Sequence, residues 1–230
     1  MTTIPGNLQH VRARIATACQ RAGRGVEEVT LLAVSKTFGA DAVRAAAAAG
    51  QRAFGENYIQ EGVEKIAALR DLGLMWHCIG TIQSNKTRLV AEHFDWVHTV
   101  DRLKIAERLS AQRPADRPPL NVCIQVNIDG GANKSGVAPG EALALARAVA
   151  ALPQLKLRGL MSIPEIAPDF EAARAVHAGA RALFDQLNAD GLGLDTLSMG
   201  MSDDLEAAIA AGSTMVRIGT AIFGSRAPKP

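Results

Sequence analysis

Short continuous apolar runs alternate with longer amphipathic segments along most of the chain. The first clear run is TLLAVSKT, residues 30–37, in which the apolar residues follow one another without polar interruption. Such a run is typical of a strand that is buried on both faces, as in a parallel sheet. The segment from Ala40 to Ala49 that follows it is alanine-rich and predicts a helix.

The same alternation recurs to the end of the chain. Strands are predicted at Thr30–Val34, Arg52–Phe54, Trp76–Gly80, Trp96–Val100, Leu120–Ile128, Leu155–Met161, Thr196–Met199 and Met215–Ile218. Helical patterns lie between them at Ile59–Leu72, Arg102–Gln112, Glu141–Ala151, Phe170–Leu187 and Asp203–Ala211. A further amphipathic helix is predicted before the first strand, from Asn7 to about Gly23, because its apolar residues recur at helical spacing.

This order of elements predicts βαβ units and a parallel sheet. Eight such units close a (β/α)8 TIM barrel, whose usual length of about 250 residues suits this chain of 230. No linker or change of composition divides the sequence. We therefore expect one domain over residues 1–230, with a frayed tail at 225–230. An open doubly wound sheet is the competing fold.

The charge balance argues against several classes of partner. Lys plus Arg is 25 and Asp plus Glu is 23, which leaves a net charge of +2. A chain without a strong overall field is not expected to bind nucleic acid or an anionic membrane, although a local anion site remains compatible with it. The N-terminus has no apolar core of the signal-peptide type, and no apolar run is long enough to cross a bilayer. We expect a cytoplasmic protein.

Cysteine and histidine spacing argues against a metal site and a disulfide framework. Cys19, Cys78 and Cys123 stand far apart and form no C-x-x-C pair, which favours three reduced thiols. The five histidines show no H-x-x-x-H spacing. His77 lies within a predicted strand, where a hydrogen-bonded structural histidine is the more common case.

Lys36 follows the first apolar run. Lysine is unusual at the end of a buried strand, because a desolvated ammonium is costly. The C-terminal strand ends of a barrel face the active site, where a desolvated lysine can act as the nucleophilic amine of Schiff-base chemistry. Alternatively, the side chain leaves the strand and reaches water along its apolar stem. This residue alone does not decide between them.

A second candidate group follows the second strand, in the motif FGENYIQE from Phe54 to Glu61. Gly55 permits a sharp turn, and Glu56–Asn57 are expected to begin the next helix. Asn57 could therefore hydrogen-bond a ligand, or it could cap that helix.

The most distinctive segment runs from Leu197 to Gly224. In it, Ser202 is expected to start a helix, and Gly219–Thr220 follow the eighth strand. Phosphate sites in barrels often lie in the loops after strands seven and eight, where a glycine lets backbone N–H groups approach an anion. The alternative is an ordinary helix cap at Ser202, with Asp203 and Asp204 balancing the helix dipole. The two aspartates indicate that Gly219–Thr220 contribute more to anion binding.

Arg217 lies inside the eighth apolar strand. A buried arginine needs a partner. It is a candidate ligand group at a strand end that faces a phosphate site. Its alternative is a salt bridge to a carboxylate of a neighbouring strand.

Together these segments resemble one family. LLAVSKT, FGENYIQE, WHCIGTIQSNK, HTVD, QVNI…KSG, RGLMSIP and LSMGMSDDLEAAIAAGSTMVRIGTAIFG occur in the order found in the pyridoxal phosphate homeostasis proteins, the YggS/PROSC family. That family shares a barrel with the N-terminal domain of alanine racemase. The resemblance extends from about Leu8 to Ser225.

The resemblance implies a role for each candidate residue toward pyridoxal 5′-phosphate (PLP). Lys36 would hold PLP as a Schiff base, and Asn57 would lie beside the cofactor ring. Arg217 would face the pyridine nitrogen. The phosphate would be held by Ser202, Gly219 and Thr220. Some positions depart from the family pattern, namely Cys78, Ile82 and Gly131 before Lys134, and these affect only local packing and loop detail.

An arginine at the pyridine nitrogen has a chemical consequence. A cation there disfavours protonation of that nitrogen, whereas PLP works best as an electron sink when the nitrogen is protonated and paired with a carboxylate. Strong carbanion chemistry is therefore not expected.

Racemisation also needs an acid or base on each face of the substrate α-carbon, and Lys36 can serve one face. Alanine racemase-like enzymes take the second from a tyrosine of a β-rich domain in the partner subunit. The sequence ends just after the barrel, so we expect no such domain here. The one tyrosine, Tyr58, adjoins Asn57 and is not a convincing second base.

Three hypotheses remain. The favoured one is a monomeric PLP-binding homeostasis protein without a dedicated reaction, which stores the cofactor or delivers it to apo PLP-dependent enzymes. The second is a weak amino-acid racemase. The third is a barrel aldolase that uses Lys36 directly on a sugar phosphate, but it lacks an acid–base partner near Lys36 and does not account for Arg217.

Overall fold

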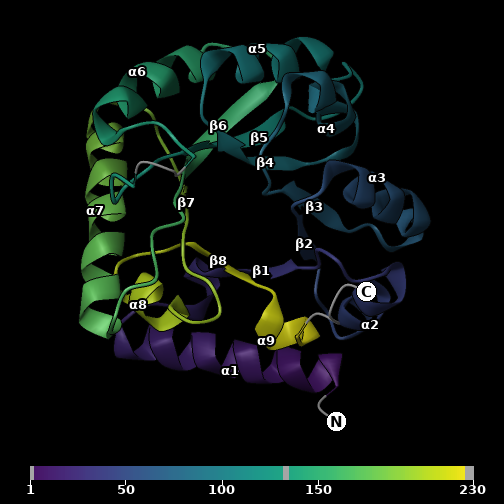
Figure 1. Cartoon of the computed structure of the whole chain (residues 1–230), viewed down its shortest axis with the longest axis vertical. Helices are drawn as coiled ribbons and strands as arrows, with labels where there is room; N and C mark the ends of the chain where they lie inside the picture. The colour runs from purple at the N-terminus through teal and green to yellow at the C-terminus, as the bar shows by residue number, and fades with distance from the viewer. Residues whose placement is uncertain (1–2, 132–134, 226–230) are drawn as a thin grey trace.

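Eight parallel strands close into a barrel in the computed structural model, which describes residues 3–131 and 135–225 (Figure 1). The strands are β1 (Thr30–Val34), β2 (Ala53–Glu56), β3 (Met75–Cys78), β4 (Trp96–Val100), β5 (Leu120–Gln125), β6 (Leu155–Met161), β7 (Thr196–Ser198) and β8 (Met215–Ile218). Each strand pairs with the next, and β8 pairs with β1 from Thr30↔Met215 to Ala33↔Ile218. The predicted TIM barrel is thereby confirmed, and the open doubly wound sheet is wrong.

Helices surround the barrel (Figure 1). They are α1 (Ile4–Arg21), α2 (Ala40–Ala48), α3 (Ile59–Ala68), α4 (Thr87–His93), α5 (Leu103–Gln112), α6 (Pro139–Ala150), α7 (Phe170–Ala189), α8 (Leu205–Ala210) and α9 (Thr220–Phe223). The additional N-terminal helix is confirmed as α1. It begins earlier than predicted because Thr3 caps it, with Oγ1 accepting a hydrogen bond from the Gly6 amide, and because Pro5 suits a first turn.

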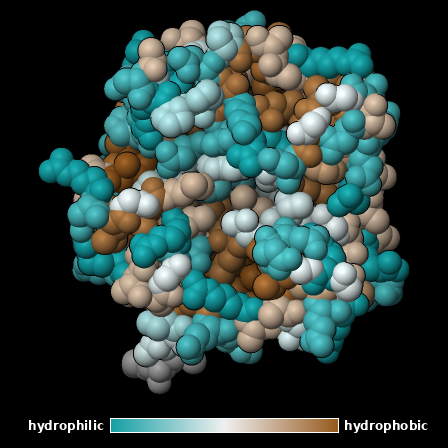
Figure 2. Space-filling model, turned by 180° about the vertical axis from the view of Figure 1, so that it is seen from behind, coloured by the Kyte–Doolittle hydropathy of each residue, from teal (hydrophilic) through white to brown (hydrophobic). Residues whose placement is uncertain are grey.

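The main hydrophobic core lies between the strands and the helices. It combines residues from both, such as Val11 of α1, Phe54 of β2 and Phe94 after α4, all of them fully buried. Two smaller apolar clusters contain strand residues and their close neighbours but no helix residue, and we place them inside the barrel. The outer surface is mixed, with hydrophilic residues over much of the rear face and apolar residues in separate patches (Figure 2).

Several predicted helix starts are wrong. The helix after β2 does not begin at Glu56, because β2 continues through that residue and Tyr58 is the N-cap of α3. The helix predicted from Ser202–Asp203 begins at Leu205, after a turn. The start of α3 at Ile59 agrees with the helical pattern, and the residues before the two helices, Asn57 and Ser202–Asp203, line the pocket described below.

Other elements were missed or divided. The helix predicted at Ile59–Leu72 ends at Ala68 and is followed by a separate 3-10 turn, Arg70–Leu72. The short helices α4 and α9 were not predicted, since each offers two turns or fewer of periodic pattern. Lys134 of the KSG motif and tail residues 226–230 lie outside the described residues.

Among the residues that the structure describes, no helix combines the length and apolar character needed to cross a membrane. Within the same residues, no cluster of three or more His, Cys, Asp or Glu side chains is arranged to hold a metal ion. The three cysteines, Cys19, Cys78 and Cys123, are buried free thiols. Burial raises the pKa of both Cys78 and Cys123 to about 12.

Candidate functional site

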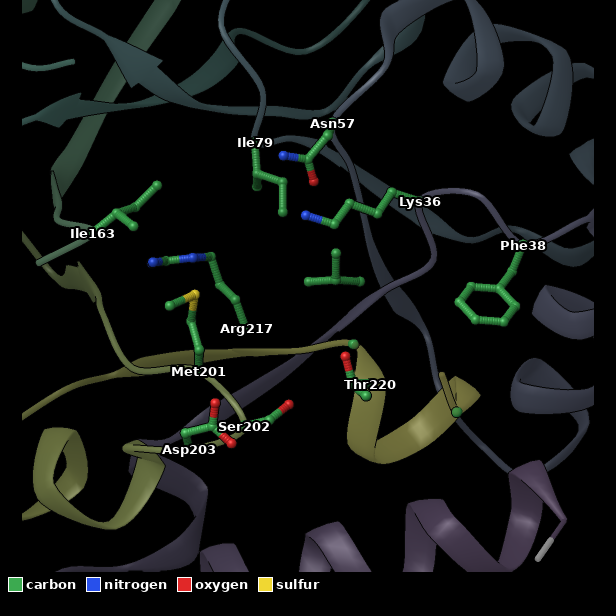
Figure 3. A pocket seen from close by; sticks show the side chains of 13 residues that line it. Lys36, Phe38, Asn57, Ile79, Ile163, Met201, Ser202, Asp203, Arg217 and Thr220 are labelled. Atoms are coloured by element: carbon green, nitrogen blue, oxygen red, sulfur yellow. The ribbon is translucent and has the colours of Figure 1, made fainter. Parts of the chain in front are cut away.

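A pocket of about 310 Å³ opens at the C-terminal ends of the strands (Figure 3). This volume is at the lower end of the range for small-molecule sites, roughly 300–1,000 Å³. Its lining brings together all six residues singled out from the sequence, namely Lys36, Asn57, Ser202, Arg217, Gly219 and Thr220. They come from four different strand ends and lie up to 184 positions apart, from 36 to 220.

Lys36 is half-buried, two residues beyond the end of β1. Its side chain points into the pocket, and its amine nitrogen lies near Ile79, on the side facing Arg217 (Figure 3). The alternative that this lysine turns away to open solvent is therefore not what the structure shows.

Asn57 lies in the short connection between β2 and α3. Because Tyr58 occupies the N-cap position of α3, the helix-capping role considered for Asn57 is wrong. The Asn57 Oδ1 atom is buried and has no hydrogen-bond partner among the described residues. A buried carbonyl acceptor without a donor is costly, so this atom indicates a place for a ligand donor.

Ser202 and Thr220 lie on the opposite side of the pocket from Asn57 (Figure 3). Gly219, which precedes Thr220 in the chain, also lines the pocket. A Cβ at Gly219 would stand 3.2 Å from the Val34 carbonyl oxygen, so a small residue is favoured there. Within the described part of the chain, the backbone amides of Thr220 and Ala221 donate to no carbonyl. Amides and hydroxyls that converge on a cavity are suited to hold an anion.

The helix α1 braces this anion-binding side from outside the barrel. It packs beside α8 and α9 (Figure 1). Arg14 donates from Nη2 to the Ser202 carbonyl at 3.0 Å and pairs through Nε with Glu206 at 2.8 Å. Asn7 donates to the Ile222 carbonyl at 2.8 Å. The sequence identified this helix but did not indicate that two of its polar residues fix the loops around the anion-binding groups.

Of the two aspartates expected at the helix start, Asp204 is held by other groups. Its Oδ1 accepts from the Met201 amide at 2.6 Å, and its Oδ2 contacts His177 Nε2 at 2.8 Å. Burial favours the protonated carboxyl, but the bonds from His177 and Met201 outweigh it and hold the pKa of Asp204 below its usual range. Of the two aspartates, Asp203 lines the pocket and Asp204 does not. Ser202 lies in a turn and does not start the helix, because α8 begins at Leu205.

Arg217 is 5% exposed and lies in β8. It donates from Nη1 to Ser198 Oγ at 2.8 Å and from Nη2 to the Ser162 carbonyl at 2.9 Å. Burial lowers the pKa of Arg217 to about 10, and Asp204 partly opposes this shift. The guanidinium is therefore still charged at neutral pH. The alternative of a salt bridge is wrong for the described residues, among which no carboxylate pairs with it.

A chain of buried hydrogen bonds leads from Arg217 into the barrel. Ser198 Oγ lies 3.0 Å from His98 Nδ1, and His98 Nε2 lies 2.9 Å from His77 Nδ1. Burial lowers the pKa of His77 to about 3 and that of His98 well below its usual value, so both rings are neutral. We call the four side chains Arg217, Ser198, His98 and His77 the barrel relay.

Arg217 fixes only the first bond of the barrel relay. A guanidinium can only donate, so Ser198 Oγ accepts from it. In the contacts of His98 with Ser198 and with His77, the tautomers of the two neutral imidazoles determine which atom donates. The sequence did not assign roles to Ser198, His98 or Ser162. The available signal was a hydroxyl or imidazole inside an otherwise apolar strand, as in WVHTV and TLS.

The comparisons with known proteins agree with this geometry. Residues 6–227 match the family described as "Alanine racemase, N-terminal domain". The chain is 63% identical over 226 residues to a protein of Pseudomonas aeruginosa named "Pyridoxal phosphate homeostasis protein", covering 98% of this chain and 97% of that one. A protein of the same name from Escherichia coli K12 is 58% identical over 236 residues, with 98% of each chain covered.

A solved structure is also similar over nearly its whole length. PipY of Synechococcus elongatus PCC7942, described as having PLP bound, is 39% identical and superposes with a TM-score of 0.80, covering 91% of this chain and all of that one. The match of the family, the identity to the named relatives and the shared closed barrel all lead to one assignment. The chain belongs to the family of the pyridoxal phosphate homeostasis proteins, whose barrel is that of the alanine racemase N-terminal domain.

Proposed function

We propose that this protein binds PLP in the pocket, with Lys36 bonded to the cofactor as a Schiff base, and takes part in PLP homeostasis without a dedicated reaction. One observation carries the proposal. The amine of Lys36 and the guanidinium of Arg217 point into a pocket whose far side is built from anion-binding groups (Figure 3). The name shared by the close relatives supports the same role.

The pocket offers polar groups of the kinds needed to bind the phosphate and the ring of PLP. The hydroxyls of Ser202 and Thr220 and the backbone N–H groups of Gly219–Thr220 are available to bind a phosphate. Such charge-assisted hydrogen bonds contribute about 1.5–3 kcal/mol each. The orphaned Asn57 Oδ1 offers an acceptor near the ring. Asp203 opposes the phosphate only in part, because its side chain is exposed to water, which screens its charge.

Arg217 determines which chemistry the site supports. PLP supplies an electrophilic aldehyde and, when its ring nitrogen is protonated, an electron sink. A guanidinium can donate to that nitrogen but cannot accept a proton from it. Two further hydrogen bonds fix the orientation of this guanidinium, from Nη1 to Ser198 Oγ and from Nη2 to the Ser162 carbonyl. The site therefore favours holding the cofactor over forming carbanions on it.

A racemase role is disfavoured by the placement of Tyr58. Its side chain is 55% exposed at the start of α3, and it is not among the residues that line the pocket. No other tyrosine exists in the chain. General acid–base groups typically contribute about 10²–10⁴-fold each, so we expect at most trace exchange at an amino-acid α-carbon.

The cellular setting is part of the same proposal. We infer a cytoplasmic monomer that passes PLP to apo PLP-dependent enzymes. Three buried free thiols are consistent with a reducing compartment. The exposed apolar side chains of Ile163 and Met201 at the pocket rim are suited to contact an acceptor protein.

Reduction with borohydride tests the covalent assignment. The purified protein is expected to carry PLP, and reduction should fix it on Lys36, as located by peptide mass analysis. Lys36→Ala should abolish the adduct, whereas Lys104→Ala on the exposed face of α5 should leave it intact. An adduct mainly on another lysine would overturn the assignment.

The same preparations test the absence of a dedicated reaction. Incubation with L- and D-alanine in D2O should show deuterium entering Cα far more slowly than an enzymatic rate of roughly 1 s⁻¹. Two-sided exchange at that rate or faster would replace the homeostasis proposal by a racemase. Reactivation of an apo PLP-dependent enzyme by the loaded protein would support delivery.

A further inference from the structure

A buried cluster of charged side chains lies behind the loop that carries Lys36. Its members are Glu56 at the end of β2 and Glu61 and Lys65 on α3, and we call them the acidic–lysine clamp. Lys65 is 6% exposed and Glu56 is fully buried. None of the three lines the pocket that holds Lys36. A buried charge is costly to desolvate, so its presence away from the site needs a reason.

The Lys65 ammonium is saturated by three acceptors. It donates to Glu56 Oε1 at 2.8 Å, to Glu61 Oε1 at 2.6 Å and to the backbone carbonyl of Ser35 at 2.7 Å. An ammonium has three protons, so each is used. Replacing Lys65 therefore removes the support of one backbone carbonyl and leaves a buried carboxylate without its counter-charge.

The clamp holds both chain neighbours of Lys36. On one side, the Ser35 hydroxyl donates to Glu56 Oε1 at 2.5 Å, and the Ser35 carbonyl accepts from Lys65. On the other side, the Thr37 amide donates to Glu61 Oε1 at 2.6 Å. The backbone of Lys36 is thus fixed from positions 35 and 37, while its own side chain points the other way, into the pocket (Figure 3).

Thr37 shows that this loop is held in an unfavourable conformation. Its φ is +70°, in the left-handed region that β-branched residues rarely adopt. Such a conformation persists only where the surroundings impose it, and it is typical of ligand-holding loops. Here the Thr37 amide donates to Glu61 Oε1, and the Phe38 amide closes the turn by donating to the Ser35 carbonyl at 3.1 Å.

We infer that Glu56, Glu61 and Lys65 are positioning residues, which hold the Ser35–Thr37 backbone so that the Lys36 amine reaches the aldehyde carbon of PLP. This inference rests on the proposed function. The covalent step joins Lys36 Nζ to that carbon, and the aldehyde oxygen leaves as water. None of the three clamp side chains lines the cofactor pocket or bonds to the anion-binding side, so we expect their loss to act chiefly on the covalent contact.

That confinement makes a comparison of two ligands the decisive test. Pyridoxine 5′-phosphate has the ring and the phosphate of PLP but an alcohol in place of the aldehyde, so it cannot bond to Lys36. Loss of the clamp should weaken PLP binding and leave pyridoxine 5′-phosphate binding unchanged. A general loosening of the barrel would weaken both ligands alike.

The first variant is Lys65→Met, which keeps an unbranched apolar side chain and removes the ammonium. We expect the dissociation constant for PLP to rise about tenfold or more, the loss typical of a charge-assisted hydrogen bond, and that for pyridoxine 5′-phosphate to change less than about twofold. Lys104→Met, exposed on α5, is the matched control and should change neither. An equal loss for both ligands, or no loss for PLP, would overturn the inference.

The second variant pair avoids the buried charge and keeps the test valid if Lys65→Met does not fold. The Glu61 side chain is 30% exposed. Glu61→Ala removes the acceptor for Thr37, whereas Glu61→Gln keeps an oxygen in the same place. We expect selective loss of PLP binding in Glu61→Ala and recovery of most of it in Glu61→Gln. Equal behaviour of the two variants would contradict the positioning role.

The proposed function and the positioning role are contradicted by different results. If the unsubstituted protein yields no borohydride-fixed adduct on Lys36, the proposed function fails. If it yields that adduct with the same PLP affinity as the clamp variants, only the positioning role fails.

Discussion

Removal of the Ser198 hydroxyl is the sharpest test of the barrel relay. Ser198 is fully buried and joins the charged Arg217 to the neutral His98. Ser198→Ala leaves one Arg217 N–H without its acceptor and His98 Nδ1 without its hydrogen-bond partner. Both groups are buried, His98 fully and Arg217 with 5% exposure.

The expected size of the effect follows from these two losses. A hydrogen bond to a charged group contributes about 1.5–3 kcal/mol, and an unsatisfied buried neutral group costs about 1–3 kcal/mol. Allowing for some relaxation, we expect the free energy of unfolding to fall by about 2–4 kcal/mol. For a chain of this size a loss of about 3 kcal/mol lowers the melting temperature by roughly 6–12 °C.

Urea unfolding of the cofactor-free protein measures this loss directly. The control is Ser110→Ala, on α5 outside the barrel, which removes a neutral hydrogen bond to the Pro153 carbonyl. It should cost only about 0.5–1.5 kcal/mol. Equal midpoints for Ser198→Ala and Ser110→Ala, at unchanged denaturant slope, would refute the claim that the relay is a coupled buried network.

Two further substitutions test other features of the barrel. Burial lowers the pKa of His77 to about 3 in the folded protein, against roughly 6.5 in the unfolded chain. Between these two pH values the unfolded chain binds more protons than the folded protein. The free energy of unfolding therefore falls as the pH drops through this window, by at most about 1.4 kcal/mol per pH unit. His77→Leu should flatten that slope in urea titrations from pH 7 to pH 4, and an unchanged slope would contradict the neutral assignment. A Cβ at Gly80 would meet the Asn57 carbonyl oxygen at 2.0 Å, so Gly80→Ala should displace Asn57 and weaken PLP binding measured by absorbance titration. Gly140→Ala, with no atom near its added Cβ, should bind as the unsubstituted protein does.

The barrel could be predicted because its strands are buried on both faces. The run Trp96–Val100 is buried at every position, and the structure has a strand with the same bounds. Leu155–Met161 also keeps its predicted bounds, although its continuous burial is limited to the last three residues. The strand ends were less certain. Glu56 is a polar residue with a preference for helices, yet it is the last residue of β2. Its buried carboxylate is stabilised there by hydrogen bonds from Lys65 and Ser35. Tertiary contacts overrode local preference at that point.

The candidate site was visible for a related reason. In a barrel every strand ends at one rim, so Lys36 after β1 and Gly219–Thr220 after β8 had to lie near each other once the fold was known. The resemblance to one family then supplied the roles expected of these residues. Both steps depend on residues that lie at strand ends, where position along the chain translates directly into position in space.

The sequence by itself determined the barrel, its additional helix and the residues of its rim, because these depend on periodicity and on the order of elements. Only the tertiary structure decided how those residues are held. His98 and Ser198 stand 100 positions apart, and Lys65 meets the carbonyl of Ser35 across 30. The sequence around a polar residue in a strand or helix does not indicate which distant residue will be its hydrogen-bond partner. Its partner is set by how the strands close and how α3 packs on them, and burial makes each such hydrogen bond obligatory.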